Sequence, residues 1–339
     1  MTTTFLDVCE VERIDHGHDD LTVVNAARVS NGRRVEELVT RDSPEDEIAF
    51  RKSLGMNLDD SLIGYLARNG HWTPFAHVRF GYGVILPLDF DWSAFLNWAG
   101  DETRSAGFTW RVEVTSEEHV RLLIHGSLYG WLRSWPPLRG PFINAIHRDI
   151  QTCAPLSYAA LDPANGQRGA CTLGPIATLP SDSWTFRIRA PLTTFRQLMR
   201  SNVGVVYNET SRRYVSDEPE IYVPDRWRSA PDKSVKQGSG SPLDEVTSAR
   251  VDERYTHHVE DGVRLYEDLL GMDVAPEMAR FHLPQSMITE LWMTATAPAI
   301  RRVLKLRLGD DGGKNHPQRE IVELATALVA ELPADFPRG

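Results

Sequence analysis

The chain has 339 residues, of which 41% are hydrophobic and 25% charged, a composition typical of soluble globular proteins. The length allows one large domain or two smaller ones. The net charge of −10 argues against a protein that wraps nucleic acid, and no apolar run is long enough to span a membrane. Cys9, Cys153 and Cys171 are odd in number and lack metal-ligand spacing. We therefore expect no disulfide framework and no metal site, and a reducing cytoplasm is the default location.

The first 88 residues predict a mixture of strands and helices. Residues 21–30 predict a strand-like run that ends at Ser30, and residues 44–54 and 59–68 predict helices. Either Asp59 or Asp60 is a candidate cap of the second helix. A strand follows, since Phe80, Tyr82 and Val84 alternate with other residues.

Residues 86–183 predict helices at 89–98, 117–135 and 142–152, followed by a loop rich in Gly and Pro at 163–183. A short pattern before this region recurs after it. Five residues match five others that lie 104 positions later: Phe80, Tyr82, Val84, Pro87 and Leu88 match Trp184, Phe186, Ile188, Pro191 and Leu192. A decayed partial duplication explains this match, and a coincidence among apolar residues explains it equally.

Residues 184–214 carry the strongest local signal. They predict a half-buried strand, then a short helix capped by Thr193 or Thr194, then a polar loop. The helix is expected to place Arg196 and Arg200 on one side. Six Arg and one acid, Glu209, give the segment a local charge balance of +5. This concentration of Arg suggests an anionic ligand such as a phosphate. A basic edge strand with solvated Arg side chains is the alternative.

The C-terminal third predicts a loop at 229–242, a long helix through Tyr255 and Leu270, and a helix over 292–308. The apolar positions of the long helix are interpreted as core. Pro298 would strain the interior of the last helix, because proline lacks the backbone N–H.

The order of several short motifs resembles the flavin-dependent thymidylate synthases. Arg200, Asn208-Glu209, Ser211 and Arg213-Tyr214 match the second half of that family's signature segment, whereas Ser201 and Asn202 replace its His and Arg. Further matching segments lie in the family's order along the chain: Ala26-Ala27-Arg28-Val29-Ser30, His71-Trp72-Thr73-Pro74-Phe75-Ala76-His77, Tyr222-Val223-Pro224, Ala275 to Arg280, Leu304 to Arg307, and His316 to Ile321. The resemblance covers roughly residues 20–85 and 184–330.

The resemblance implies an α/β (α+β) fold with a twisted sheet flanked by helices and a large insertion. Residues 1–85 and 184–339 would form the synthase-like domain and residues 86–183 the insertion. It also implies a homotetramer that shares its active sites between subunits.

Carried over position by position, the family's nucleotide-binding residues correspond to Gln197, Glu209, Ser211, Arg212, Arg213, Arg280 and Arg307. Arg307 is the expected catalytic residue, close to the pyrimidine ring. The flavin-contacting set is eroded, since Thr296, Pro298 and Arg302 stand where the family has Asn, Arg and Asn. The expected cofactor-binding residues are His71, Thr73, Arg200, Asn208, Arg302 and His316.

The implied reaction is the reductive methylation of C5 in a uracil nucleotide, UMP or dUMP. Methylenetetrahydrofolate would supply the carbon, and reduced FAD, recharged by NADPH, would supply the hydride. No Cys nucleophile is required in this family. A role in nucleoside-antibiotic biosynthesis is one option for such a diverged chain. The alternative is a catalytically inactive paralogue that binds a uridine nucleotide as a regulatory or partner subunit.

Overall fold

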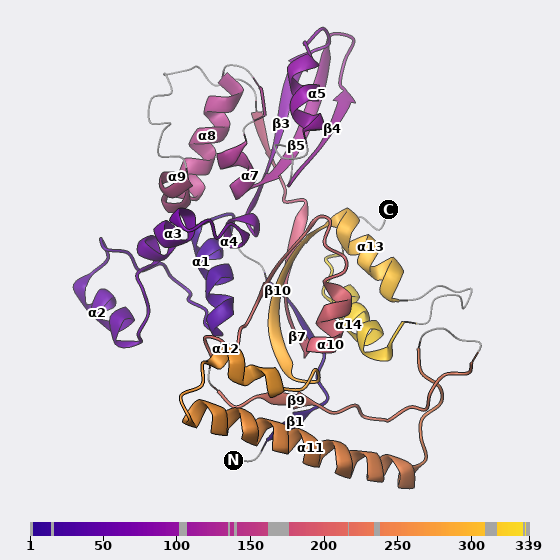
Figure 1. Ribbon diagram of the computed structural model, residues 1–339. Coiled ribbons are helices and arrows are strands. Elements are labelled where there is room, and N and C mark those ends of the chain that lie inside the picture. Colours follow the sequence, from indigo (N-terminus) through magenta and orange to yellow (C-terminus); the bar gives the residue numbers. More distant parts are fainter. Residues whose placement is uncertain are drawn as a thin grey trace. The chain divides into compact units, whose positions relative to one another are not determined.

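The computed structural model describes residues 3–14, 17–101, 107–134, 136–138, 141–161, 176–215, 217–233, 238–308, 317–334 and 336. The chain divides into two compact units. The first unit comprises residues 1–14, 29–32 and 185–339, and the second comprises residues 15–28 and 33–184. Each unit combines helices with an antiparallel-paired, four-stranded sheet (Figure 1), so the predicted mixed α/β fold class is confirmed.

The sheet of the second unit has the strand order β4-β5-β3-β6. Its strands are β3 (Arg79–Pro87), β4 (Phe108–Val114), β5 (His119–Ser127) and β6 (Ile176–Leu179). Its helices are α1 (Asp20–Arg28), α2 (Glu45–Ser53), α3 (Asp59–Arg68), α4 (Thr73–Ala76), α5 (Ser93–Gly100), α7 (Leu128–Arg133), α8 (Pro141–Cys153) and α9 (Pro155–Leu161). The predicted alternation of β3 is confirmed, and Phe80, Tyr82 and Val84 belong to the core of this unit.

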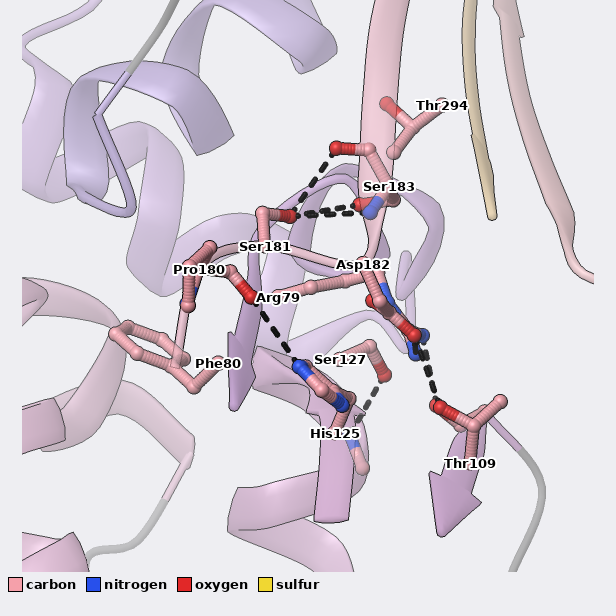
Figure 2. Close-up of polar contacts among 12 residues, drawn as sticks. Arg79, Phe80, Thr109, His125, Ser127, Pro180, Ser181, Asp182, Ser183 and Thr294 are labelled. Carbon is pink, nitrogen blue, oxygen red and sulfur yellow. Dashed lines mark hydrogen bonds and ion pairs between the residues drawn. The ribbon is translucent and has the colours of Figure 1, made fainter. Parts of the chain in front are cut away.

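A polar cluster fastens one end of this sheet (Figure 2). Arg79 donates two hydrogen bonds to Asp182, from Nε at 2.7 Å and Nη2 at 3.0 Å, and a third from Nη1 to the Gly107 carbonyl at 2.7 Å. Thr109 donates its hydroxyl proton to the same carboxylate at 2.9 Å. Burial alone would raise the pKa of Asp182, but the hydrogen bonds and charge of Arg79 more than offset it and the pKa is lowered. The half-buried carboxylate is therefore held ionised.

The first unit has the strand order β2-β7-β10-β8, and a separate parallel pair joins β1 to β9. Its strands are β1 (Thr4–Leu6), β2 (Glu10–Ile14), β7 (Ser183–Pro191), β8 (Val205–Glu209), β9 (Glu220–Tyr222) and β10 (Ile288–Thr296). Its helices are η1 (Val29–Asn31), α10 (Leu192–Leu198), α11 (Glu245–Gly271), α12 (Pro276–Ala279), η2 (Arg280–His282), α13 (Ala297–Arg307) and α14 (Arg319–Ala330). The predicted long helix is confirmed as α11, and its buried residues Val259, Val263 and Tyr266 lie in the core.

Three predicted elements have the wrong type. Residues 20–28 form α1 and not a strand, because Asp19 accepts the Thr22 N–H at 3.0 Å and both Val23 and Val24 are fully buried. The predicted helix at 117–135 is mostly β5, a central strand paired on both sides. The predicted helix at 292–308 begins only at Ala297, because residues 288–296 form the buried strand β10. In the two strands, pairing with neighbours overrides the local pattern.

Several predicted caps are also wrong. Leu58 precedes α3 without a side-chain cap, and the Asp59 carboxylate instead accepts the Val39 N–H at 2.8 Å and pairs with Arg28. Likewise α10 begins at Leu192, ahead of both threonines. Pro298 lies in the first turn of α13 and not in its interior, where proline is well tolerated.

The loop predicted at 163–183 contains β6, while residues 162–175, including Cys171, lie outside the described residues. Helix α3 coincides with its predicted range 59–68, and α2 and α8 lie close to theirs. None of the helices in the described ranges has the length and apolar character that a membrane crossing requires.

Candidate functional site

Strand β8 and the turn after it organise the candidate site of the first unit. Glu209, the last residue of β8, is paired with Leu291 of β10. The Thr210 N–H then donates to the Glu290 carbonyl at 2.9 Å, and the Ser211 N–H donates to the Ser30 carbonyl at 3.0 Å. Two motif segments that are far apart in sequence are thus joined by backbone hydrogen bonds. This pairing fixes where the side chains of the turn can lie.

Two arginines converge on the Ser211 hydroxyl. Arg280, from η2, approaches it with Nη1 at 3.4 Å, and Arg213 approaches with Nε at 3.3 Å. The Arg213 guanidinium also lies 4.9 Å from the centroid of the Tyr214 ring. Arginine forks near a hydroxyl donor are suited to bind an oxyanion such as a phosphate.

Glu209 is half-buried beside this cationic group. Burial raises the pKa of its carboxyl, and the charges of Arg280 and Arg196 oppose that shift in part. A carboxylate in this position accepts hydrogen bonds, so it complements hydroxyl donors such as those of a sugar.

A second group of side chains lies where α10, β8 and α13 meet. The Tyr207 hydroxyl donates to the Leu198 and Ser201 carbonyls at 3.2 and 3.1 Å, which ties β8 to the end of α10. Burial raises the pKa of Tyr207 to about 12, against the opposing charges of Arg302 and Arg307 on α13. Tyr207 and Glu209 are two positions apart on β8, so their side chains point to the same face of the sheet.

Arg307 donates from Nη2 to the Gln197 carbonyl, while the Gln197 side chain donates to Gln318 at 2.7 Å. Burial and the neighbouring charge of Arg200 lower the pKa of Arg307. Within the described part of the chain, its buried Nε has no hydrogen-bond partner. An unpaired donor of this kind is costly unless an acceptor of a ligand satisfies it.

The local surplus of positive charge is smaller than the sequence suggests. Arg187 forms ion pairs with Glu12 and Glu290, and Arg189 with Glu10 and Glu220. Arg212 donates to the Asp217 side chain at 3.1 Å, within its own loop. Three of the six arginines of residues 184–214 therefore have a carboxylate partner.

The expectation that one helix carries both Arg196 and Arg200 is wrong. Helix α10 ends at Leu198, and Arg200 lies in the turn beyond it. Sequence reasoning missed Tyr207, and it missed that the charge of Arg196 partly offsets the rise that burial causes in the pKa of Glu209. Tyr207 could have been found from its position two residues before Glu209, because alternate residues of a strand share one face.

The predicted flavin-contacting residues are divided between the two units. Arg302 donates to the Val203 carbonyl, and Asn208 is paired with Trp292 of β10, on the face opposite to Tyr207 and Glu209. His71 and Thr73 are exposed residues of the second unit, at the start of α4, where the His71 ring packs 5.7 Å from that of Tyr65. His316 lies outside the described residues.

Known proteins resemble the segment that carries most of this site. Residues 177–338 match the family model described as "Thymidylate synthase complementing protein". The flavin-dependent thymidylate synthase of Streptomyces avermitilis is 35% identical over 157 residues, which cover 44% of this chain and 62% of that protein. The enzyme of the same name from Kosmotoga olearia is 35% identical over 152 residues, covering 45% and 63%. The chain thus spans about three fifths of the length of the curated relatives that it matches.

A solved structure, the UMP/dUMP methylase PolB from Streptomyces cacaoi bound with 5-Br UMP, aligns with 97% of this chain and 91% of its own at 21% identity and a TM-score of 0.45. The family-model match falls on the segment that carries β8, η2 and α13. Residues 177–338 of this chain are therefore similar in sequence to the flavin-dependent thymidylate synthases.

Proposed function

We propose that the chain binds a uracil nucleotide and catalyses the reductive methylation of its C5 atom. The observation that carries the proposal is the convergence of Arg213 and Arg280 on Ser211, beside Glu209, at one end of β8. This group offers cations to a phosphate and a carboxylate to a sugar hydroxyl, the two polar parts that every nucleotide has.

Arg213 and Arg280 hold the 5′-phosphate in this proposal, and Glu209 accepts a hydrogen bond from the sugar. Ser211 lies between the two arginines and adds a hydroxyl donor. Gln197 and Arg212 complete the nucleotide-facing set. Anchoring the phosphate fixes the orientation of the pyrimidine ring, which contributes to rate by positioning the reacting carbon.

Arg307 is the proposed catalytic residue. C5 of uracil is a weak nucleophile, and charge builds on the ring as it reacts. The guanidinium is held in place by the Gln197 carbonyl before any ligand arrives, and its Nε is a donor without a partner in the described residues. Preorganised donors aimed at developing charge are among the largest contributions to catalysis.

No cysteine of the described residues is suited to act as the nucleophile instead. Burial, followed by the nearby charges of Glu323, Glu320 and Asp7, raises the pKa of Cys9 to about 12. Burial also raises the pKa of Cys153. Since the thiolate is the nucleophilic form, neither thiol is activated.

The donor set of the first unit fits the charge of FAD. Arg200 and Arg302 are cationic and would hold the cofactor's pyrophosphate. Bound FAD, once reduced, supplies the hydride for the methyl group, with NADPH and methylenetetrahydrofolate as co-substrates. Arg302 already donates to the Val203 carbonyl, so its guanidinium would serve the chain and the cofactor together.

One incubation tests the proposed function. The purified chain is mixed with FAD, NADPH, methylenetetrahydrofolate and either UMP or dUMP, and the nucleotide is analysed by mass spectrometry. We expect a product heavier by one CH₂ unit from at least one nucleotide, and omission of FAD should abolish it. Nucleotide binding without FAD binding or product would instead support the inactive paralogue.

A further inference from the structure

Three strands of each sheet follow the same order, whereas the fourth strand comes first in the chain in one unit (β2) and last in the other (β6). In the first unit the order is β8-β10-β7-β2, and in the second it is β4-β5-β3-β6. In each sheet the second strand has nine residues and leads directly into a helix, β10 into α13 and β5 into α7. The third strand, β7 or β3, also has nine residues and ends in proline. Strand β4 therefore occupies the place in its sheet that β8 occupies in the other.

Strand pairing gives the equivalent positions on these two edge strands. Trp110 pairs with Ile124, and Tyr207 pairs with Met293, and each partner lies four residues before the helix that follows. By the same register Val112 occupies the position of Glu209. The face that carries the candidate site in the first unit is thus apolar in the second.

Helix α5 covers part of this apolar face, where Phe95 and Trp98 pack against Trp110, but the side chains of the edge strand β4 are partly exposed. Trp110 is 39% exposed, Val112 47% and Val114 76%. The three side chains alternate along β4 and so share one face of the sheet. Strand β4 is also the outer strand, paired in the described residues with β5 alone. An exposed edge strand with apolar side chains is a surface for pairing with another strand.

The charges between these residues indicate which strand would pair there. Arg111 and Glu113 lie on the other face of β4, two positions apart, and form a 2.9 Å ion pair in one chain. If two copies of β4 pair antiparallel around Val112, each Arg111 lies opposite Glu113 of the other copy, and each Trp110 lies opposite Val114. Shifting the register by one pair places Arg111 opposite Arg111 or Glu113 opposite Glu113. The strand is therefore self-complementary in a single register.

We propose that two copies of this chain associate through β4, paired antiparallel about a twofold axis at Val112. The two four-stranded sheets become one sheet of eight strands across the interface. Two Arg–Glu pairs form on one face, and the apolar residues Trp110, Val112 and Val114 of both copies cover each other on the opposite face. Such an interface is isologous, as expected for a cyclic dimer.

Charge reversal tests the register. Arg111→Glu places two carboxylates opposite each other at both ends of the interface, and Glu113→Arg does the same with two cations. Like charges directly opposite destabilise strand pairing. We expect each single variant to raise the dissociation constant of this association step on the order of tenfold in sedimentation equilibrium at low salt.

An equimolar mixture of the two variants is the decisive sample. In a mixed dimer both ends of the interface again pair a carboxylate with a guanidinium, because one copy carries only acids at positions 111 and 113 and the other carries only arginines. The mixture should therefore associate about as tightly as the unaltered chain, although neither variant can form the ion pair within its own chain. Val112→Lys, which places two ammonium groups at the axis, should weaken association in every sample. Phe50→Glu, at an exposed apolar residue of α2, is the matched control and should change nothing.

Three results would overturn the proposal. The unaltered chain could stay monomeric at tens of micromolar, the single variants could associate as tightly as it does, or their mixture could associate no better than its components. Circular dichroism of each variant shows that folding is kept, and an unfolded variant would not be rescued by mixing.

Discussion

The two units share the order of three sheet strands but differ in the side chains of the equivalent edge strand. On β8, Tyr207 and Glu209 face arginines from α10, η2 and α13. On β4, the corresponding residues are Trp110 and Val112, and the Trp110 ring packs 5.9 Å from Phe95 and 6.0 Å from Trp98. The same three-strand arrangement thus carries a polar cluster in one unit and an apolar one in the other. The side chains at two alternating positions of the edge strand, Tyr207 and Glu209 or Trp110 and Val112, make this difference.

The two units use their charged side chains differently. In the second unit a carboxylate and an arginine satisfy each other, as Figure 2 shows for Arg79 and Asp182. In the first unit the arginines around Ser211 outnumber the carboxylates. We therefore expect mutations to affect stability in the second unit and ligand binding in the first.

The largest expected effect is on stability, from Arg79→Ala. It leaves the half-buried Asp182 carboxylate without its main partner. Breaking a fully buried ion pair costs about 3–5 kcal/mol, so we expect a loss toward the lower end of that range. Urea unfolding measures the loss. Arg121→Ala, an exposed position on β5, is the matched control and should change stability by less than about 0.5 kcal/mol. If Arg79→Ala lowered nucleotide affinity and left the unfolding free energy unchanged, the ion pair would serve ligand binding and not stability.

Arg307→Ala should lower turnover on the order of a hundredfold or more, as removal of a preorganised donor does in other enzymes. Single-turnover kinetics with saturating nucleotide would measure this loss. Lys305→Ala, exposed on the same helix, should leave turnover near its original value. If turnover survives in the Arg307 variant and FAD is lost instead, Arg307 belongs to the cofactor site.

Arg280→Ala and Arg213→Ala should each weaken nucleotide binding by about 1.5–3 kcal/mol, the range for hydrogen bonds to a charged group. Isothermal titration calorimetry gives both the affinity and the stoichiometry. We expect one nucleotide per chain, because the equivalent face of the second unit is apolar. Arg226→Ala, an exposed arginine of the first unit, serves as the control. Two equivalent sites per chain would contradict the comparison between the units.

The smallest effect concerns pH. Burial raises the pKa of Glu209 in the folded chain, so the folded state binds this proton more readily than the unfolded state. The ionised carboxylate therefore destabilises the fold above its folded pKa, and this cost disappears as the pH falls toward the unfolded pKa. Glu209→Gln should stabilise the chain at neutral pH and lose that advantage in acid. Unfolding free energies from pH 4 to pH 8 would reveal a missing or opposite trend.

Sequence reasoning predicted most of the site because its residues lie in short motifs. Arg213, Arg280 and Ser211 were assigned together from motif order, and the structure brings their side chains together. The neutralisation of Arg187 and Arg189 was not foreseeable, because their carboxylate partners come from β2, β9 and β10. Such pairs depend on strand register, which local patterns do not contain.

The fold was predicted less evenly. Helices α2, α3 and α8 follow from their amphipathic patterns, whereas β5 and β10 resemble helices because buried central strands have no alternation to distinguish them. The division into residues 1–85, 86–183 and 184–339, and the duplication within it, stay predictions. The tetramer, the cytoplasmic location and the choice between UMP and dUMP also stay predictions.

The interleaving of the two units has a consequence for the order of folding during synthesis. The second unit is complete once residue 184 has been made. The first unit must pair β2 with β7, and almost the whole second unit lies between these two strands in the sequence. The pair Glu10 and Arg189 is separated by 179 residues. Closing so long a loop is slow while the intervening chain is unfolded, and it becomes easier once that chain has compacted. We expect the second unit to fold first and to shorten the effective loop between β2 and β7, so that the sheet of the first unit closes last.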